Sequence, residues 1–353
     1  MQKNLVAKRD PIVFGAIFSP LTSQKKIELL CSYDPDFKSL FQREVAECVG
    51  AEWIRELDEQ TALCCWPEGF QPIFCRHRFP VQMIHTFEGS ELDEVGGWSP
   101  GPEFVERVTG RFSFQVAANL RLPWSFGALI PRWLESFGLP GEGMDKRRPE
   151  TVVSAYFHQT SKGLTLYLGV SAPEQNLSPW MRGECRIPRS KESVSRAEQK
   201  LLEALELCPG VEGSRALDLG AAPGGWTRIL ADRGFEVDAV DPAELDSRVV
   251  ALPKIHHHKT TAGVFLEQLT DSTYDLIVCD MKMEPLMACR LVLEFAPLLN
   301  DSGWLILTLK LPKGPSALNV ARESLKGLSS SFQIVQARQL YFNRNEVTVI
   351  ARK

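Results

Sequence analysis

The pattern of apolar and polar positions changes at about residue 190 of this 353-residue chain. After that point, strand-like and helix-like apolar segments alternate, which is typical of a parallel sheet with helices on both faces. Before it, short apolar segments are mixed with proline and glycine turns, which indicates smaller α+β units. The sequence therefore predicts an α/β fold in which two small α+β units precede a larger domain with a mostly parallel sheet.

The clearest elements are expected in the last domain, 190–353. A helix with one apolar face is predicted over 193–207, and a second helix follows the first strand as far as Arg233. The predicted strands are 216–219, 236–240, 275–279 and 304–309, followed by a late pair at 332–339 and 346–351.

The earlier part divides by composition into a unit at 1–90, a unit at 91–175 and a connector at 176–189 rich in polar residues and proline. The alternating patterns predict the following elements: a buried strand at 12–18, a helix at 37–49, apolar segments at 62–66 and 73–75, a surface connection at 88–101, a strand at 112–116, a helix at 128–137 and a strand pair at 152–157 and 164–170.

Residues 215–226 read R-A-L-D-L-G-A-A-P-G-G-W, an apolar strand that runs into a glycine-rich turn and the start of a helix. Glycine lets the backbone approach a ligand closely, and sheets of this kind bind ligands beyond the carboxyl ends of their strands. The spacing is not the G-x-G-x-x-G of dinucleotide folds. It favours a ligand with a cationic or amino-acid-like part, the alternative being an ordinary strand-to-helix turn.

Charged residues stand at the ends of the neighbouring apolar segments. Asp241 closes the second strand, where a carboxylate can accept hydrogen bonds from ribose hydroxyls. Asp280, Lys310 and Glu346 end consecutive apolar segments, and Lys200 lies on the helix before the glycine turn. Because strand ends converge on one crevice, we expect these side chains to meet there. Lys282 follows Asp280 closely, but alternation places it beyond the strand end.

The word D-L-G-A-A-P-G-G-W resembles the cofactor loop of S-adenosylmethionine-dependent methyltransferases, especially the FtsJ-like RNA ribose methyltransferases. Lys200, Asp280, Lys310 and Glu346 match the Lys-Asp-Lys-Glu tetrad of that family position by position. The short sequences that flank these four residues are similar to those of one branch, the THUMP-containing bacterial enzymes that methylate a cytidine ribose of 23S ribosomal RNA. The resemblance covers roughly 145–353.

This resemblance implies a Rossmann-like domain that uses S-adenosylmethionine to methylate a ribose 2′-oxygen by in-line displacement, with 23S ribosomal RNA or its precursor as partner. In it, Lys310 activates the hydroxyl, Asp280 holds Lys310, and Lys200 and Glu346 position the ribose. The units at 1–90 and 91–175 would be ferredoxin-like and THUMP-like. The implied cofactor residues are Ser195, Asp218, Ala222, Pro223, Gly224, Gly225, Trp226, Asp241, Thr261 and Asp280.

Three positions leave alternatives open. Ser195 is also a natural helix N-cap. The family has an acid near the adenine where this chain reads Lys259–Gly263, which leaves adenine recognition to Thr261 or to a backbone group. The triplet His256–His258 looks like a metal site, but consecutive side chains point apart, so a solvated loop and no bound metal are expected.

The overall balance of charge does not suggest a general nucleic-acid coat, because the net charge is −4. Local basic clusters do occur at 76–78, 146–148 and 182–191, and these could grip RNA phosphates or simply cover solvated faces. Trp180 and Tyr341 could stack on a base or serve as packing residues.

The cysteines are scattered and contain no C-x-x-C pair, which indicates neither a zinc site nor a disulfide framework and favours the cytoplasm. Ile12–Phe18 is too short for a signal peptide, and no apolar stretch is long enough to cross a bilayer. A monomer is favoured. Two other functions remain open: a non-catalytic RNA-binding or ribosome-assembly factor that keeps the fold, and a ribose methyltransferase for another RNA, such as a messenger cap.

Overall fold

The computed structural model describes residues 26–67, 69–208, 210–269 and 273–353, so the strand predicted at 12–18 lies outside the described residues. Contacts among them define two compact units. One contains 26–67 and 72–186, and the other contains 187–353 together with 69–71. Each unit is described by itself.

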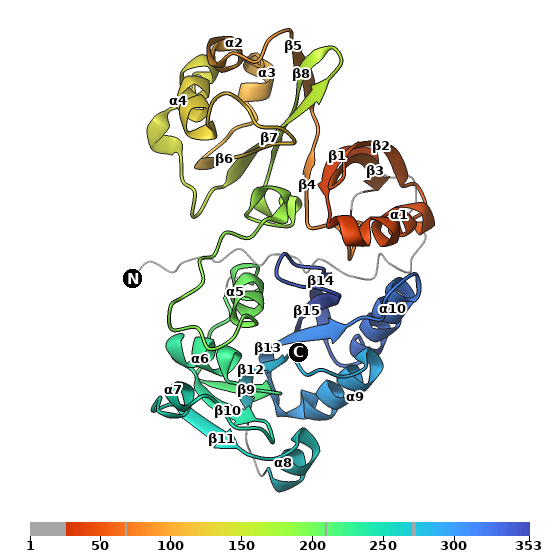
Figure 1. Cartoon of the computed structure of the whole chain (residues 1–353), viewed down its shortest axis with the longest axis vertical. Coiled ribbons are helices and arrows are strands. Elements are labelled where there is room, and N and C mark those ends of the chain that lie inside the picture. Colours follow the sequence, from red (N-terminus) through yellow and green to blue (C-terminus); the bar gives the residue numbers. More distant parts are fainter. Residues whose placement is uncertain (1–25, 68, 209, 270–272) are drawn as a thin grey trace. The chain divides into compact units, whose positions relative to one another are not determined.

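The C-terminal unit is built on one seven-stranded sheet in the order β11-β10-β9-β12-β13-β15-β14 (Figure 1). The first five strands in this order are parallel, and β15 is antiparallel to both β13 and β14. This mostly parallel sheet confirms the predicted Rossmann-like fold. Its strands are β9 (Arg215–Leu219), β10 (Glu236–Val240), β11 (Ile255–His258), β12 (Tyr274–Cys279), β13 (Leu299–Lys310), β14 (Gln333–Arg338) and β15 (Glu346–Arg352).

Helices α5 and α6 pack on the sheet and bury one continuous apolar core. Leu201 of α5 and Leu230 of α6 are fully buried there against Val278 and Ile306 of the sheet. Helices α9 and α10 pack against each other. The helices of this unit are α5 (Glu198–Glu206), α6 (Gly225–Asp232), α7 (Ser247–Val250), α8 (Ala262–Gln268), α9 (Pro285–Phe295), η6 (Ala296–Leu298) and α10 (Ser316–Leu328).

Two predictions for this unit were wrong. The helix expected from residue 193 begins at Glu198, because the side chain of Glu198 accepts backbone hydrogen bonds from Val194 and Ser195 and folds that segment into a turn. The triplet His256–His258 lies in strand β11, not in a solvated loop. It pairs in parallel with β10, whose carboxylates at Glu236 and Asp238 bind His256 and His258.

The other unit contains two four-stranded sheets. The first has the order β2-β3-β1-β4 with every pair antiparallel, so that β3 is inserted between β1 and β2, the two strands joined by helix α1. Its elements are β1 (Lys26–Ser32), η2 (Pro35–Phe37), α1 (Lys38–Glu47), β2 (Glu52–Asp58), β3 (Thr61–Pro67) and β4 (His77–Pro80).

The second sheet has the order β5-β8-β7-β6, and helix α4 connects its parallel pair β6 and β7. Trp133 and Phe137 of α4 pack on Val153 and Phe157 of β7. The elements are β5 (Met83–Phe87), α2 (Leu92–Gly97), α3 (Pro102–Val105), β6 (Phe112–Ala118), α4 (Phe126–Phe137), η3 (Gly141–Gly143), β7 (Thr151–Thr160), β8 (Gly163–Ser171), η4 (Pro173–Asn176) and η5 (Met181–Gly183).

Two expectations for this unit were wrong in detail. The stretch 88–101 contains helix α2, which is fixed to α4 by a 2.9 Å hydrogen bond from the Trp133 indole to the Val95 carbonyl. Helix α1 ends at Glu47, so Val49 is 78% exposed and lies off its apolar face. The apolar segment 73–75 is buried, and its backbone is irregular. The ferredoxin-like and THUMP-like assignments, and the boundaries at 90, 175 and 189, stay predictions.

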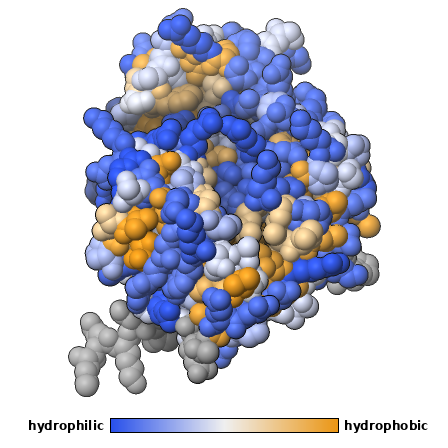
Figure 2. Space-filling view, turned by 60° about the horizontal axis from the view of Figure 1, so that its bottom comes forward, coloured by the Kyte–Doolittle hydropathy of each residue, from blue (hydrophilic) through white to orange (hydrophobic). Residues whose placement is uncertain are grey.

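The surface shown in Figure 2 is mostly hydrophilic, with hydrophobic residues gathered in small patches. Within the described part of the chain, no helix has the length and apolar character that a membrane span requires. Exposed large apolar side chains occur on several different elements, and they include Val49, Ile54, Ile84, Val250, Val264, Met287 and Tyr341.

Candidate active site at the carboxyl edge of the sheet

Four charged side chains meet where strands β12 and β13 end. Asp280 directly follows β12, and Lys310 is the last residue of β13. Glu346 opens β15 instead of ending a strand, but β15 is antiparallel and pairs Glu346 with Lys310, so it reaches the same edge. Lys200, on α5, completes the group. The structure therefore brings together all four residues of the predicted tetrad.

These four side chains form a closed ring of alternating charge, called the charged ring below. Lys200 Nζ lies 2.6 Å from Glu346 Oε2 and 3.4 Å from Asp280 Oδ2. Lys310 Nζ lies 2.9 Å from Glu346 Oε1 and forms an ion pair with Asp280 Oδ1. The side chains are between 14% and 21% exposed. Each ammonium thus contacts both carboxylates, and the group remains accessible.

The opposite charges in the ring shift the pKa values of Lys310 and Glu346 so that both side chains stay charged. Burial alone lowers the pKa of the Lys310 ammonium, but Asp280 and Glu346 outweigh it and leave the pKa raised. Burial raises the pKa of Glu346, but Lys200 and Lys310 outweigh it and leave that pKa lowered. Lys310 is therefore positively charged at neutral pH. In that form it can stabilise negative charge on an oxygen, and it must lose its own proton before it can act as a base.

The glycine-rich turn packs tightly against its neighbours. Gly224 has a φ of +103°, and a Cβ atom there would lie 2.8 Å from Val249. A Cβ atom at Gly225 would lie 2.8 Å from the Cβ atom of Ser195. Neither position accommodates a side chain, which explains the glycine pair and leaves the backbone of the turn close to the crevice.

Asp241 joins this turn to the end of β10. Its Oδ2 accepts a 3.1 Å hydrogen bond from the backbone N–H of Ala222, the residue before Pro223, and its Oδ1 accepts a 2.8 Å bond from that of Ala243. Asp241 is half-buried. Each carboxylate oxygen keeps a further lone pair, so the group can still accept hydrogen bonds from a ligand.

Other residues predicted to bind a cofactor have side chains engaged within the protein. Asp218 is 1% exposed and accepts a 2.6 Å hydrogen bond from the Thr227 hydroxyl. Trp226 is 4% exposed, and its indole donates a 2.7 Å bond to the Ala197 carbonyl. These two support the glycine-rich turn from the core side. Thr261 is an exposed N-cap of α8 whose hydroxyl accepts from Val264. Their contacts with a cofactor stay predictions.

Ser195 lies beside Gly225 but is not the N-cap of α5, because that position is Ala197. The Ser195 hydroxyl accepts a 3.0 Å hydrogen bond from the Ala197 N–H within the turn before the helix, and the Ser195 N–H donates to the Glu198 carboxylate. Sequence reasoning missed Glu198, which is 2% exposed and lies 2.5 Å from Arg228 of α6. The spacing Ser-x-x-Glu was the available signal.

The buried carboxyl of Asp218 leads to a prediction about how the stability of the protein depends on pH. Burial raises the pKa of its carboxyl to about 7, although the hydrogen bond from Thr227 opposes the shift. The pKa of Asp218 is higher in the folded than in the unfolded protein, so folding favours the protonated carboxyl. The stability that this protonated group contributes is complete below about pH 4 and is lost as pH rises through about 7. Asp218→Asn stays neutral and should unfold with a free energy up to about 4 kcal/mol higher than the wild type at pH 8.

Urea denaturation of both proteins between pH 4 and pH 8 measures this difference. Asp301→Asn is the control, since the side chain of Asp301 is fully exposed. It should follow the wild-type curve throughout. A constant difference between Asp218→Asn and the wild type across this range would contradict the buried-carboxyl assignment.

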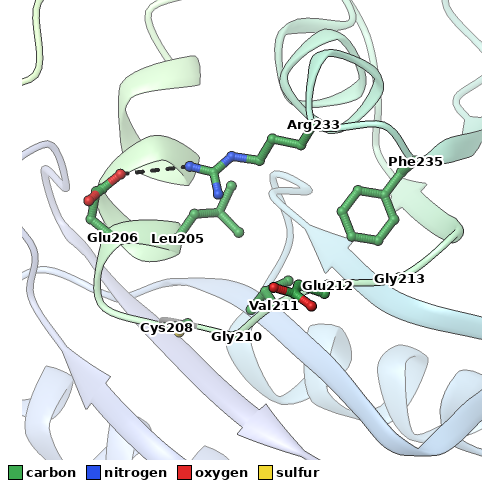
Figure 3. A pocket seen from close by; sticks show the side chains of 9 residues that line it. All are labelled: Leu205, Glu206, Cys208, Gly210, Val211, Glu212, Gly213, Arg233 and Phe235. Atoms are coloured by element: carbon green, nitrogen blue, oxygen red, sulfur yellow. Dashed lines mark ion pairs between the residues drawn. The ribbon is translucent and has the colours of Figure 1, made fainter. Parts of the chain in front are cut away.

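A cavity of about 530 Å³ lies at the opposite edge of the same sheet (Figure 3). Its lining residues Gly213 and Phe235 come just before β9 and β10, and Arg233 spans it toward Glu206 at 3.8 Å. Ligands of such sheets bind beyond the carboxyl ends of the strands, so the charged ring and not this cavity is the candidate site.

The other sequence-predicted features are spread over both units. Arg147 and Arg148 are exposed, whereas Arg182 is half-buried and contacts Gln60 and Glu184. Lys282 is exposed. In the described ranges, no cluster of three or more histidine, cysteine or acidic side chains could hold a metal ion.

Residues 193–310 match the family of FtsJ-like methyltransferases. The chain therefore contains an FtsJ-like methyltransferase domain, which confirms the resemblance to that family, and the THUMP-containing branch stays a prediction. Lys200, Asp280 and Lys310 lie inside the match, and Glu346 lies beyond it.

Two relatives share the name Ribosomal RNA large subunit methyltransferase M. The one from Halorhodospira halophila is 35% identical over 182 residues, which are 49% of this chain and 51% of that protein. The one from Yersinia enterocolitica is 32% identical over 204 residues, 53% of each. The chain thus spans about half the length of these relatives. Among solved structures, TrmN from Thermus thermophilus is 18% identical over 93% of this chain and 99% of that one, with a TM-score of 0.35, too low to support an argument.

Proposed function

We propose that this protein is an S-adenosylmethionine-dependent methyltransferase that acts on the ribose 2′-oxygen of a cytidine in 23S ribosomal RNA. The observation that carries the proposal is the charged ring, set at the carboxyl edge of the sheet in an FtsJ-like methyltransferase domain. The names of the relatives support ribosomal RNA of the large subunit as the substrate.

The residues around the turn suit such a cofactor. The half-buried Asp241 carboxylate has lone pairs left for ribose hydroxyls, and the two crowded glycines keep the backbone of 222–225 close to the crevice. Ser195 and Asp280 border the same region, and Thr261 or nearby backbone groups would meet the adenine. When bound, S-adenosylmethionine supplies an electrophilic methyl group on a positively charged sulfur.

In this proposal, the charged ring acts on the substrate hydroxyl. The Lys310 ammonium stabilises the negative charge that develops on the 2′-oxygen as this oxygen attacks the methyl group. The new carbon–oxygen bond replaces the carbon–sulfur bond, S-adenosylhomocysteine leaves, and the hydroxyl proton passes to solvent. Asp280 and Glu346 fix the position of Lys310 from two sides, and Lys200 balances their charge. Because the ring is held together by ion pairs between the protein's own side chains, little reorganisation is needed when the substrate arrives.

Mass-spectrometric mapping of ribose methylation in 23S ribosomal RNA tests the proposal. RNA from cells that lack the protein should lose methylation at one cytidine. Wild-type protein should restore it, and the Lys310→Ala variant should not. Identical maps with and without the protein would contradict the assignment, and methylation lost from another RNA would redirect it to that substrate.

The unit at 26–186 supports RNA as the partner through the exposed Arg147 and Arg148, next to which Asp145 accepts hydrogen bonds from both backbone N–H groups. Exposed guanidinium groups can contact phosphates without reading sequence. We place the protein in the cytoplasm, where its substrate is made.

Isothermal titration with S-adenosylmethionine separates this proposal from a non-catalytic assembly factor, for which no binding is expected.

A further inference from the structure

An exposed aromatic residue lies on the loop that leads into the charged ring. Residues 339–345, called the tyrosine loop below, join β14 to β15 and end directly before Glu346. Tyr341 of this loop is 40% exposed. Its ring centre lies 5.2 Å from that of Phe342, and the two rings are nearly perpendicular. Because β14 and β13 run in the same direction, the loop offers an aromatic surface at the same edge of the sheet as the charged ring.

The tyrosine loop is held firmly in place. The carboxylate of Glu203, which is 2% exposed, accepts hydrogen bonds from the backbone N–H groups of Tyr341 at 2.9 Å and Phe342 at 3.0 Å. The buried Asn343 accepts a 2.8 Å bond from the N–H of Leu340. The backbone carbonyl of Asn345 accepts a 3.0 Å hydrogen bond from the N–H of Leu311, the residue after Lys310. A buried carboxylate thus fixes the backbone beneath an exposed ring.

One helix supports both the loop and the charged ring. Glu203 follows Lys200 by three positions on α5, and side chains at that spacing share a face with β-carbons about 5–6 Å apart. Lys200 reaches Glu346 while Glu203 reaches Tyr341. The aromatic surface and the catalytic charges are therefore fixed relative to each other by successive contacts of the same helix.

We infer that Tyr341 is a stacking platform for an unpaired base of the RNA, next to the ribose that is methylated. The inference rests on the proposed function and names how that substrate is held. A ribose can reach the charged ring only if its nucleotide is not base-paired in a duplex. Proteins hold unpaired bases by stacking them on aromatic side chains. Tyrosine has few rotatable bonds, so a fixed backbone presents its ring at a small loss of entropy.

Fluorescence anisotropy with a fluorescein-labelled RNA decamer of cytidines, in the presence of S-adenosylhomocysteine, tests the platform. Tyr341→Ala should bind the decamer about tenfold more weakly than the wild type, because stacking of this kind contributes that much per base. Tyr341→Phe keeps the ring and should stay within about twofold. Met287→Ala, at another exposed apolar side chain, is the matched control and should bind as the wild type does.

A second decamer with abasic riboses separates stacking from phosphate contacts. The wild type and Tyr341→Ala should bind it equally. Equal binding of the cytidine decamer by these two proteins would overturn the platform, as would an equal loss for Tyr341→Ala on both decamers. The assay requires no methyl transfer. A protein that shows the predicted binding but no transfer would therefore refute the proposed activity and leave the platform in place.

Discussion

Replacing Lys310 with alanine is expected to slow methyl transfer by about 10²- to 10³-fold, the loss typical when one charge-stabilising donor is removed. Affinity for S-adenosylmethionine should change little, since the glycine-rich turn and Asp241 lie on other strands. The variant also leaves Asp280 and Glu346 with only Lys200 between them. The pKa of Glu346 should then rise, because one of the two charges that lower it is gone.

Single-turnover methyl transfer and isothermal titration measure these two effects separately. Lys310→Arg retains the charge and should recover part of the rate. Lys282→Ala removes the exposed lysine two residues after Asp280 and should behave as the wild type. Full activity in Lys310→Ala would eliminate the proposed role of the charged ring.

The pH dependence of the same rate distinguishes two roles for Lys310. Its raised pKa keeps the ammonium charged up to and beyond the ordinary lysine value of about 10.4. As a charge stabiliser, Lys310 should give a rate that is level through neutral pH and falls only in that alkaline range. As a general base it would give a rate that rises steadily with pH toward the same value.

The sequence was most informative for site residues that stand at the ends of predicted strands. Asp280 and Lys310 were found because they end parallel strands, and parallel strand ends share one edge. Glu346 reached that edge for a different reason, the antiparallel direction of β15, which its own residues do not reveal. The sequence argument placed Glu346 at this edge as the end of an apolar segment, so the position was right although the reason was wrong.

Long-range hydrogen bonds account for much of what sequence reasoning missed. The sequence pattern indicated no partner for the apolar segment 73–75, where the Glu44 carboxylate accepts the N–H groups of Ile73 and Phe74 at 2.8 Å each, in place of a neighbouring strand. Glu203 likewise binds a loop more than a hundred residues away, at Tyr341. Local patterns contain no signal for such partners, because the acceptor and donor are brought together only by the fold.

Glu198→Ala is expected to produce the largest loss of stability among the substitutions considered. Its carboxylate lies 2.5 Å from the Arg228 guanidinium, with side chains 3% and 10% exposed, and it also accepts the Val194 N–H at 2.8 Å. Removing Glu198 leaves Arg228 with the more exposed Asp232, at 2.7 Å, as its ion-pair partner, and it leaves the Val194 N–H without its acceptor. The free energy of unfolding should therefore fall by about 3 kcal/mol, the lower end for a broken buried pair. Chemical denaturation of the purified protein measures this loss.

The same two helices provide the control. Glu206 of α5 and Arg233, just after α6, form an exposed pair at 3.8 Å, so Glu206→Ala should cost less than about 1 kcal/mol. A similar small loss for Glu198→Ala would show that its buried pair contributes nothing special. Cofactor affinity should separate the variants further. Glu198 also fixes the segment that holds Ser195 against Gly225, so its loss should weaken binding of S-adenosylmethionine even where the protein remains folded, whereas Glu206→Ala should leave binding unchanged.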